Sequence, residues 1–318
     1  MHTRRTPVRL LLPAVLLTAA AALAGCGSSS SSTASDSGSG SGDFGSVSIS
    51  GDVGTEAKVA FDGQVTDQST STKVLTEGDG PVVANGDNVV LQTVIADGFT
   101  QKTAADSYQD GQPQVVPLTD SVPAIFKDAL EGKKVGSRVA IYAPADKIFG
   151  AQGNPSLNIG NKDSVVIVLD IVGKPLDGPD GTSHASPSWA PKVVEKNGTV
   201  TGLNFAGTPK PNGALQVADL KTGTGDTVKS GQTIIVDYLG SVYKGKQPFD
   251  ENFSKDPVSF QIGTGNVIKG WDQALVGKKV GSRVVIAIPP KDGYGSQAQT
   301  GIPANSTLYF VVDILGAF

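Results

Sequence analysis

The chain has 318 residues, a formal net charge of −4 and a charged fraction of only 18%. Its length allows two domains with separate cores, and its 40 glycines with few aromatic residues are typical of a protein rich in strands and loops. The mildly acidic charge argues against binding to nucleic acid or to an anionic membrane surface. No stretch reaches the roughly 18 to 20 apolar residues that a membrane-spanning helix requires.

The chain begins with the pattern of an export signal. Arginines at its start precede a short apolar run, Leu10–Leu23, and this order predicts a signal peptide over residues 1–25. Cys26 is the only cysteine, so it cannot form an internal disulfide. The Leu-Ala-Gly-Cys sequence that ends at Cys26 resembles a bacterial lipobox, which implies diacylglycerol attachment there rather than an incidental thiol. We therefore expect an extracytoplasmic lipoprotein, anchored to the cell membrane through lipid only.

Two segments of biased composition separate the remaining parts of the chain. Residues 26–46 are rich in Ser and Gly and have too few apolar side chains to form a core, which predicts a flexible tether behind the lipidated cysteine. Residues 174–192 are rich in Pro, Gly and Ser and are predicted to be a linker between domains. His184 lies in this linker, where a solvated side chain is a simpler interpretation than a metal ligand.

The chain contains two copies of one pattern. The octet GKKVGSRV occurs at Gly132–Val139 and again at Gly277–Val284, an offset of 145 residues. The glycine-rich turns before the octet and the apolar run after it repeat at nearly the same offset. These matches predict a first domain over residues 47–173 and a second over residues 193–318.

The second repeat is predicted to be mostly β-structure with one short helix. Trp271, Ala274 and Leu275 follow helical spacing, and Gly277 ends the pattern. A helix of about two turns does not persist alone, so it must pack on the sheet. The expected class is α+β, with an antiparallel sheet wrapped around one short helix in each of two domains. The predicted strands are Leu215–Leu220, Thr233–Val242, Val258–Ile262, Ser282–Ile288 and Thr307–Leu315.

The conventional catalytic residue types are missing from both repeats. Neither repeat contains His or Cys, which excludes Ser/His and Cys/His nucleophiles and histidine metal sites. Asp250 and Glu251 are adjacent, so on a strand their side chains point apart rather than share a proton. An enzyme built from these residues would have to act without a nucleophile or a general base, and we expect no metal and no cofactor.

Aromatic residues are concentrated in the second repeat. Any one of them is explained most simply as a core residue, but together they stand in motifs that resemble the FKBP-type peptidyl-prolyl cis–trans isomerases. The resemblance covers nearly all of the last ~110 residues, in the order and spacing of that family. The motifs are Gly231–Gly240 (GQTIIVDYLG), Gln247–Asp250 (QPFD), Phe260–Trp271 (FQIGTGNVIKGW), Gly281–Gly295 and Ile302–Phe310 (IPANSTLYF).

The resemblance implies a small apolar pocket for a proline ring, with Trp271 at its floor. It places Asp250 at the rim, the Tyr294 hydroxyl on a substrate carbonyl, and the backbone N–H of Ile268 on another. Val258 stands where the family usually has an aromatic residue, and the loop after Tyr294 lacks a His that is frequent there. The implied lining residues are Tyr238, Phe249, Val258, Val267, Ile268, Trp271, Ile302 and Phe310.

The implied function is a protein-folding catalyst for X–Pro bonds of unfolded or newly exported polypeptides, with macrolide immunosuppressants as further candidate ligands. An alternative is a non-catalytic binding module or holdase chaperone for exported proteins, in which both repeats bind extended segments. A purely structural envelope lipoprotein would require the second pocket to be vestigial as well.

The first repeat has lost the residues on which the resemblance rests. At the offset of the octet, Tyr238 corresponds to Thr93, and Ile268 corresponds to Pro123, which has no N–H to donate. No Phe-Asp pair can be placed in the first repeat between positions 99 and 111, although Asp106 is nearby. We therefore predict an FKBP-like scaffold with little or no isomerase activity. The remaining replacements are Trp271 by Phe126, Tyr294 by Phe149 and Phe310 by Ile167.

Overall fold

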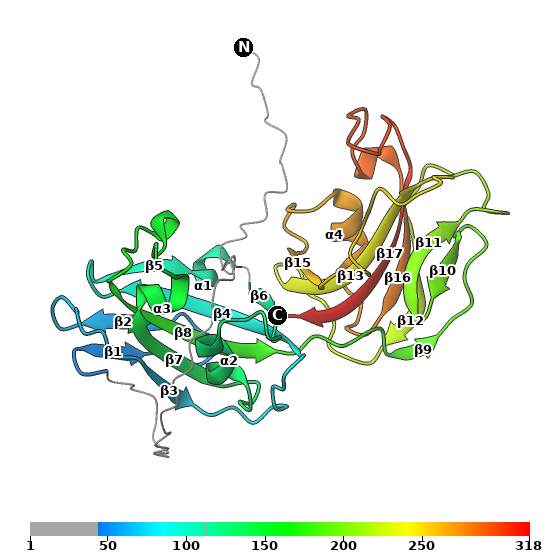
Figure 1. The fold of residues 1–318 in the computed structure, drawn as a ribbon. Coiled ribbons are helices and arrows are strands. Elements are labelled where there is room, and N and C mark those ends of the chain that lie inside the picture. The colour runs from blue at the N-terminus through cyan, green and yellow to red at the C-terminus, as the bar shows by residue number, and fades with distance from the viewer. Residues whose placement is uncertain (1–43, 112) are drawn as a thin grey trace, which may run out of the picture.

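A computed structural model describes residues 44–111 and 113–318. Most of its regular structure is antiparallel β-sheet, in two large sheets and two separate hairpins, with a few short helices (Figure 1). The predicted α+β class is therefore confirmed. The predicted signal peptide, Cys26 and most of the tether lie outside the described residues.

The first domain contains one large sheet, one hairpin and short helices. The hairpin β1–β2 comes first, and the sheet has the strand order β3-β7-β8-β4-β5, with β6 paired to the other end of β4. The elements are β1 (Val47–Ser50), β2 (Lys58–Phe61), β3 (Ser71–Thr76), β4 (Asn88–Asp97), β5 (Lys102–Asp106), α1 (Ser107–Asp110), β6 (Gln114–Pro117), α2 (Ala124–Leu130), β7 (Arg138–Pro144), α3 (Ala145–Phe149), the 3₁₀ turn η1 (Pro155–Leu157) and β8 (Ser164–Gly173).

The second domain repeats this arrangement. Its sheet has the order β9-β12-β16-β17-β13-β14, with β15 paired to the other end of β13. The elements are β9 (Gly181–Ser183), β10 (Lys192–Lys196), β11 (Thr199–Asn204), β12 (Gln216–Gly223), β13 (Thr233–Val242), β14 (Asp250–Glu251), β15 (Val258–Gln261), α4 (Lys269–Leu275), β16 (Arg283–Ile288), η2 (Pro290–Asp292) and β17 (Leu308–Ala317). The five strands predicted in this repeat agree with β12, β13, β15, β16 and β17 to within a few residues at each end.

Strand register proves that the two sheets are equivalent residue by residue. Leu91 pairs with Ile171 in the first sheet, and Val236 pairs with Ile314 in the second, directly after a β-bulge in both cases. These pairs reproduce the sequence offset of 145 residues on β4 and of 143 residues on β8. The GKKVGSRV octets form the same turn between helix and strand in both domains, so they are scaffold.

One short helix packs on the inner face of each sheet. In α4, Trp271, Ala274 and Leu275 are buried against apolar side chains of the sheet, as their helical spacing predicts. Gly277 follows the helix at φ +86°, a left-handed conformation that favours glycine, and its N–H donates to the Val228 carbonyl. Burial on the sheet stabilises a helix that is too short to persist in water.

A β-hairpin covers the outer face of each sheet. Val47 and Ile49 of β1 are buried with Tyr142 and Val168 of the first sheet. Val193 and Leu203 of β10–β11 pack in the same way on the second sheet. Phe44 stacks on Tyr142, and Trp189, which lies at the same offset of 145 residues, packs on the second outer face. The repeated unit therefore includes a hairpin ahead of the sheet.

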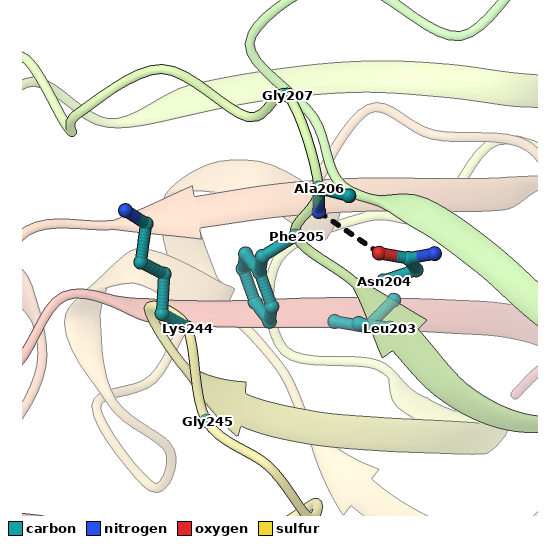
Figure 2. Close-up of a pocket in the computed structure, with 7 residues that line it drawn as sticks. All are labelled: Leu203, Asn204, Phe205, Ala206, Gly207, Lys244 and Gly245. Carbon is teal, nitrogen blue, oxygen red and sulfur yellow. Dashed lines mark hydrogen bonds between the residues drawn. The ribbon is translucent and has the colours of Figure 1, made fainter.

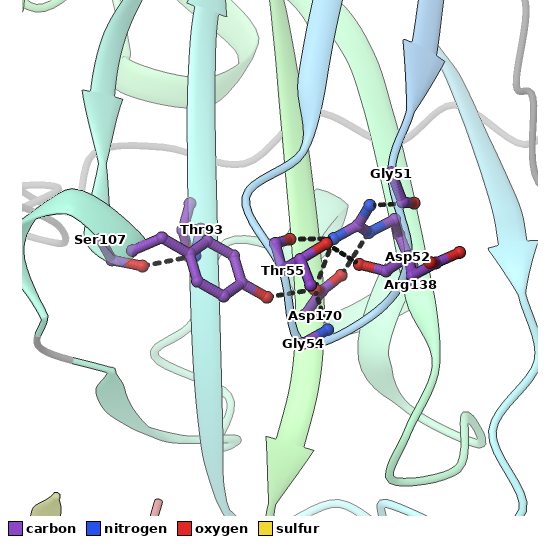
Figure 3. A network of polar contacts seen from close by, with 9 residues as sticks. Gly51, Asp52, Gly54, Thr55, Thr93, Ser107, Arg138 and Asp170 are labelled. Atoms are coloured by element: carbon purple, nitrogen blue, oxygen red, sulfur yellow. Dashed lines mark hydrogen bonds and ion pairs between the residues drawn. The ribbon is translucent and has the colours of Figure 1, made fainter.

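A buried ion pair ties each hairpin to its sheet. In the first domain the Arg138 guanidinium donates to both carboxylate oxygens of Asp170, at 2.6 and 2.7 Å. It also donates to the carbonyls of Gly51 and Thr55 in the β1–β2 turn, each at 2.6 Å (Figure 3). The Tyr108 hydroxyl donates to Asp170 as well, and burial raises the pKa of Tyr108.

The second domain has the same device at the equivalent positions. Arg283 donates to both oxygens of Asp313 at 2.6 Å and also pairs with Glu195 on β10. One difference is that Asp237 faces Asp313 across the strands, where the first domain has Gln92 facing Asp170. Burial, and then the charge of Asp313, raise the pKa of Asp237 to about 6.

The segment predicted as a linker is only partly a linker. Gly181–Ser183 forms the edge strand β9 on β12, and Ala190 is buried under the second hairpin. A Cβ at Gly181 would lie 2.0 Å from the Thr222 carbonyl oxygen, so this close pairing requires glycine. Among the described residues, no helix is long and apolar enough to cross a membrane.

Candidate active site

Five aromatic side chains meet on the inner face of the second sheet, above α4. The Trp271 ring lies at the centre, with ring centroids 5.4 Å from Tyr238, 5.3 Å from Phe260 and 5.4 Å from Phe310, all close to edge-on. Phe249 contacts Phe310 edge-to-face at 5.6 Å. Edge-to-face packing matches the electrostatics of aromatic rings. We call Tyr238, Phe249, Phe260, Trp271 and Phe310 the aromatic cluster.

The aromatic cluster has a buried base and half-buried walls. Trp271 and Phe310 are each 4% exposed. Tyr238, Phe249 and Phe260 are only partly buried, although they pack on the same core. The cluster therefore presents an apolar surface that is open on the side of its walls.

Gly240 makes room for this arrangement. A Cβ at Gly240 would lie 2.6 Å from the Phe249 ring and 2.7 Å from the Phe310 ring, distances that side chains do not tolerate. Gly240 faces Phe310 on β17 and Asp250 on β14 in the strand register. The absence of a side chain here allows both rings to close over the strand.

Hydrogen bonds fix Tyr238 from both ends. The Asn252 side chain accepts from the Tyr238 backbone N–H at 2.7 Å, and its amide group donates to the Val236 carbonyl at 3.1 Å. The Tyr238 hydroxyl donates to Asp250 at 2.5 Å. Burial is the main cause of the raised pKa of Tyr238, and the bond to the Asp250 carboxylate adds to it. Tyr238 is therefore a neutral donor that holds an exposed carboxylate at the edge of the aromatic cluster.

Three donors near the aromatic cluster have no partner among the described residues. Ile268 is the N-cap of α4, and its N–H makes no hydrogen bond there. The Tyr294 hydroxyl is also unpartnered, and burial together with the Asp250 charge raises the pKa of Tyr294. The buried Trp271 Nε1 has no partner either. Buried or half-buried donors normally find an acceptor, so this set is suited to a ligand that brings carbonyl groups.

The structure brings all the residues named from the sequence into one place. Ile302 is buried in the same hydrophobic cluster as Trp271 and Phe310. The half-buried side chains of Val258, Val267, Ile268 and Tyr294 pack around it. Asp250 joins them through Tyr238. The roles that the resemblance assigns to these residues stay predictions.

The sequence did not identify three further residues of this site. Phe260 belongs to the aromatic cluster, and its alternation with Val258 on one strand could have revealed it. The Asn252 side chain holds the β13 backbone by hydrogen bonds, and Gly240 leaves space for two rings because it has no side chain. Only the structure shows these two roles.

The first domain keeps an aromatic ring at only one of the positions equivalent to the aromatic cluster, where Phe126 stands for Trp271. Register pairs Ile95 with Ala105 in the first domain, where Gly240 pairs with Asp250 in the second. Ala104 and Ala105 therefore replace the Phe249-Asp250 pair that the sequence could not place. The fully buried Ile95 side chain fills the space that Gly240 leaves open. The Ser107 hydroxyl makes the contact equivalent to that of Asn252, since it accepts from the Thr93 N–H at 2.7 Å.

What remains in the first domain is a small void. Thr93, Phe126, Leu130 and Val122 help to line a cavity of about 20 Å³. This volume accommodates about one water molecule and no proline ring. Pro123 is the N-cap of α2, as Ile268 is of α4, so this position offers no N–H.

A larger depression lies on the opposite face of the second sheet. It has a volume of about 560 Å³ and is lined by the end of β11, around Phe205, and by the turn Lys244-Gly245 (Figure 2). Phe205 packs edge-on against Tyr309, whose neighbour Phe310 points to the other face. The depression is therefore separated from the aromatic cluster by the sheet. Within the described residues, no group of His, Cys, Asp and Glu side chains could hold a metal ion.

Comparisons with known proteins identify the family that the second domain resembles. Residues 225–315 match the family model for the FKBP-type peptidyl-prolyl cis–trans isomerases. The second domain is thus an FKBP-type domain, of the peptidyl-prolyl isomerase class of enzymes. This match lies within the second domain, and the likeness of the first repeat to it rests on the strand topology that the two share.

Among curated proteins, the chain resembles FK506-binding protein 4 of Gibberella zeae, with 41% identity over 138 residues that cover 43% of this chain and 26% of that protein. The chain thus spans about a quarter of this fungal relative's length. Among solved structures, it is similar to AtFKBP13 (31% identity, 33% of this chain and 93% of that chain, TM-score 0.31). It is also similar to FkpA from Escherichia coli (34% identity, 34% of this chain and 53% of that chain, TM-score 0.31).

Proposed function

We propose that the second domain catalyses cis–trans isomerisation of X–Pro bonds in unfolded or newly exported polypeptides. The observation that carries this proposal is the aromatic cluster, open on one side and bordered by the unpartnered donors of Ile268 and Tyr294. An apolar surface of this kind suits a proline ring, and the donors suit the carbonyl groups of a bound peptide. The Asp250 carboxylate borders this surface through its hydrogen bond from the Tyr238 hydroxyl.

The chemistry fits a site that has no nucleophile. Amide resonance sets the barrier of about 18–20 kcal/mol for rotation about the C–N bond. Twisting this bond removes the resonance and makes the amide less polar. Apolar surroundings therefore favour the twisted state over the planar one, which is differential binding without covalent chemistry. Hydrogen bonds from Ile268 and Tyr294 would hold the flanking carbonyls while the bond rotates.

The first domain, in this proposal, contributes no isomerisation. Ile95 occupies the space of the rings, and Ala105 stands in place of Asp250. Its preserved scaffold makes it a platform or spacer for the second domain.

We also propose that the chain is exported and lipid-anchored. Cys26 follows a signal-peptide pattern and stands in a sequence like a lipobox. The Cys26→Ser chain should lose incorporation of labelled fatty acid in a bacterial host and leave the membrane fraction. Equal labelling of both chains would contradict this part of the proposal.

Ligands of the FK506 class are proposed to compete for the same aromatic cluster. The curated relatives carry FK506-binding in their names, and the segment that matches the family model, 225–315, contains the whole aromatic cluster. An FK506-type macrolide should inhibit isomerisation by the wild-type chain and quench or shift Trp271 fluorescence. Unchanged fluorescence at saturating macrolide would exclude this ligand.

The direct test is a refolding assay limited by proline isomerisation, with the whole chain as catalyst. The slow phase takes roughly tens to hundreds of seconds without a catalyst, and the wild-type chain should shorten it. If the chain only suppresses client aggregation and leaves the slow phase unchanged, the alternative of a holdase chaperone is favoured instead.

A further inference from the structure

The two domains touch through the same face. The apolar side chains of Val90 and Ile235 are fully buried in one cluster, together with Leu315, although they belong to different domains. Val90 and Ile235 are equivalent positions on β4 and β13, directly before the bulge in each strand. The half-buried Val172, at the position equivalent to Leu315, packs on the same cluster. The contact is thus arranged like the interface of a two-fold symmetric dimer, inside one chain.

The C-terminal residue sits between the two halves of this contact. A Cβ at Gly173 would lie 2.1 Å from the Phe318 ring, and one at Gly316 would lie 2.8 Å from it. Gly173 faces Val90 and Gly316 faces Ile235 in the strand register, so these two glycines are equivalent as well. The Phe318 backbone is held by two hydrogen bonds to Thr233, each 3.0 Å long. One ring therefore fills the space that two glycines leave open.

The contact reaches the strand that forms one wall of the aromatic cluster. Strand β6 of the first domain lies in contact with β15 of the second, beside the C-terminus (Figure 1). On β15, Ser259 pairs with Ile235 of the contact, while its neighbours Val258 and Phe260 point to the other side. Thr233, at the far end of this pairing, also donates from its hydroxyl to the Gly111 carbonyl of the first domain at 3.0 Å.

The strand β15 has little else to hold it. It has four residues, all only partly buried, and it pairs with β13 on one side only. A short edge strand of this kind opens at low free-energy cost unless something packs on it. Its residue Phe260 contacts both Tyr238 and Trp271, so movement of β15 displaces a wall of the aromatic cluster.

We infer that the first domain is a positioning element for the second: it docks through Val90 and Gly173 against Ile235 and Phe318, and it holds β15 in the geometry that the isomerase site requires. This inference rests on the proposed isomerase function. It explains why a domain without the aromatic cluster keeps its whole scaffold, since the docking face is built from that scaffold. The partner of this face is the sister domain of the same chain.

Two opposite changes at one contact test the inference in the full-length chain. Gly173→Leu inserts a side chain where the Phe318 ring lies, and Phe318→Ala removes the ring while keeping its backbone hydrogen bonds. Both should lower kcat/KM for a proline peptide by about tenfold, because a displaced wall disturbs substrate positioning. Both should also speed amide exchange in 258–261 by at least about tenfold, with the rest of the second sheet unchanged. Gly178→Leu is the matched control, because Gly178 has open space around it and an ordinary φ.

A disulfide shows whether the docked state exists in solution. In a Cys26→Ser chain, Val90→Cys combined with Ile235→Cys should form a disulfide on mild oxidation, whereas Val90→Cys with Val285→Cys should not. Val285 is buried on the other face of the second sheet.

The outcomes separate the two proposals. A wild-type chain without isomerase activity refutes the proposed function, and the exchange and disulfide results still decide the docking. Unchanged activity and unchanged exchange of 258–261 in both Gly173→Leu and Phe318→Ala would overturn the inference. Failure of the 90–235 disulfide would overturn it as well.

Discussion

The two domains share a scaffold and differ in the surface that the scaffold presents. Strand order, the bulge between the two longest strands of each sheet and the buried Arg–Asp pair are the same in both. The inner face differs, because the second domain has Gly240 beneath two aromatic rings and the first has Ile95 in that space. A sheet of this kind therefore tolerates replacement of its site residues without loss of its fold. Because the first domain keeps the fold without the aromatic cluster, the fold does not require the cluster. Its presence in the second domain alone therefore indicates a site rather than a part of the core.

The largest loss of stability is expected from breaking the buried Arg–Asp ion pair that the two domains share. Arg138→Met removes one partner of a pair whose side chains are only 2% and 1% exposed, and leaves Asp170 buried. We expect a loss of about 3–5 kcal/mol in the free energy of unfolding of the first domain. Arg283→Met should cost less, because the Arg283 side chain is 14% exposed. Urea unfolding followed by circular dichroism measures both, and equal costs would contradict the stated dependence on burial.

The next prediction converts the second domain toward the first. Gly240→Ile places a side chain within the Phe249 and Phe310 rings and should lower kcat/KM about 100-fold by displacing them. The overpacked strand should lose only about 1–3 kcal/mol of stability. Phe126→Leu, in the first domain, serves as control and should leave the rate unchanged.

A smaller loss of isomerase activity is expected when the Asp250 carboxylate is removed. Asp250→Ala removes the acceptor of the Tyr238 hydroxyl and should lower kcat/KM about tenfold, since hydrogen bonds to charged groups contribute about 1.5–3 kcal/mol. Asp250 is exposed, so the fold should be unaffected. Tyr294→Phe should cost about threefold, as expected for a neutral hydrogen bond of roughly 0.5–1.5 kcal/mol. Peptide isomerisation rates for both variants test the order, and a larger loss for Tyr294→Phe would reverse the assigned roles.

A further effect concerns pH and the difference between Asp237 and Gln92. The pKa of Asp237 is raised to about 6 in the folded protein from an ordinary value of 3.8. Its contribution to stability is therefore fully present below about pH 4 and is lost as the pH rises through 6. Asp237→Asn should stabilise the second domain by about 1–2 kcal/mol at pH 7.5, after allowance for solvent screening, and by nearly nothing at pH 4.

Denaturation followed by tryptophan fluorescence reports this change, because both tryptophans lie at the second domain. Gln92→Asp is the reciprocal variant and should introduce a similar loss of stability at pH 7.5 in the first domain, which urea unfolding followed by circular dichroism measures. A gain from Asp237→Asn that is the same at pH 4 and pH 7.5 would contradict the role of ionisation.

Much of the fold was predictable because the repeat and the strand patterns are local. The five strands and the helix of the second domain follow from alternation, helical spacing and glycine turns, and the structure agrees with them. The covering hairpins were not predicted, because the two copies share little beyond an aromatic residue, Phe44 in one and Trp189 in the other. The edge strand β9 was missed since a three-residue strand carries no periodicity.

The sequence predicts a residue of the site only where the identity of its side chain indicates its role. The residues named from the motifs lie together, but Gly240 and Asn252 act through register and backbone contacts, which a sequence does not display. The offset of 145 residues already relates Ala104 and Ala105 to Phe249 and Asp250, and the strand pairing agrees with it.

The most direct test of a single working site is the exchange rate of a proline peptide, measured by NMR with the full-length chain. Wild-type chain and Phe126→Leu should both accelerate cis–trans exchange to the same extent, and Gly240→Ile should leave it near the uncatalysed rate. Exchange that stays fast in Gly240→Ile, or that is not accelerated by the wild-type chain, would contradict the assignment of isomerisation to the second domain.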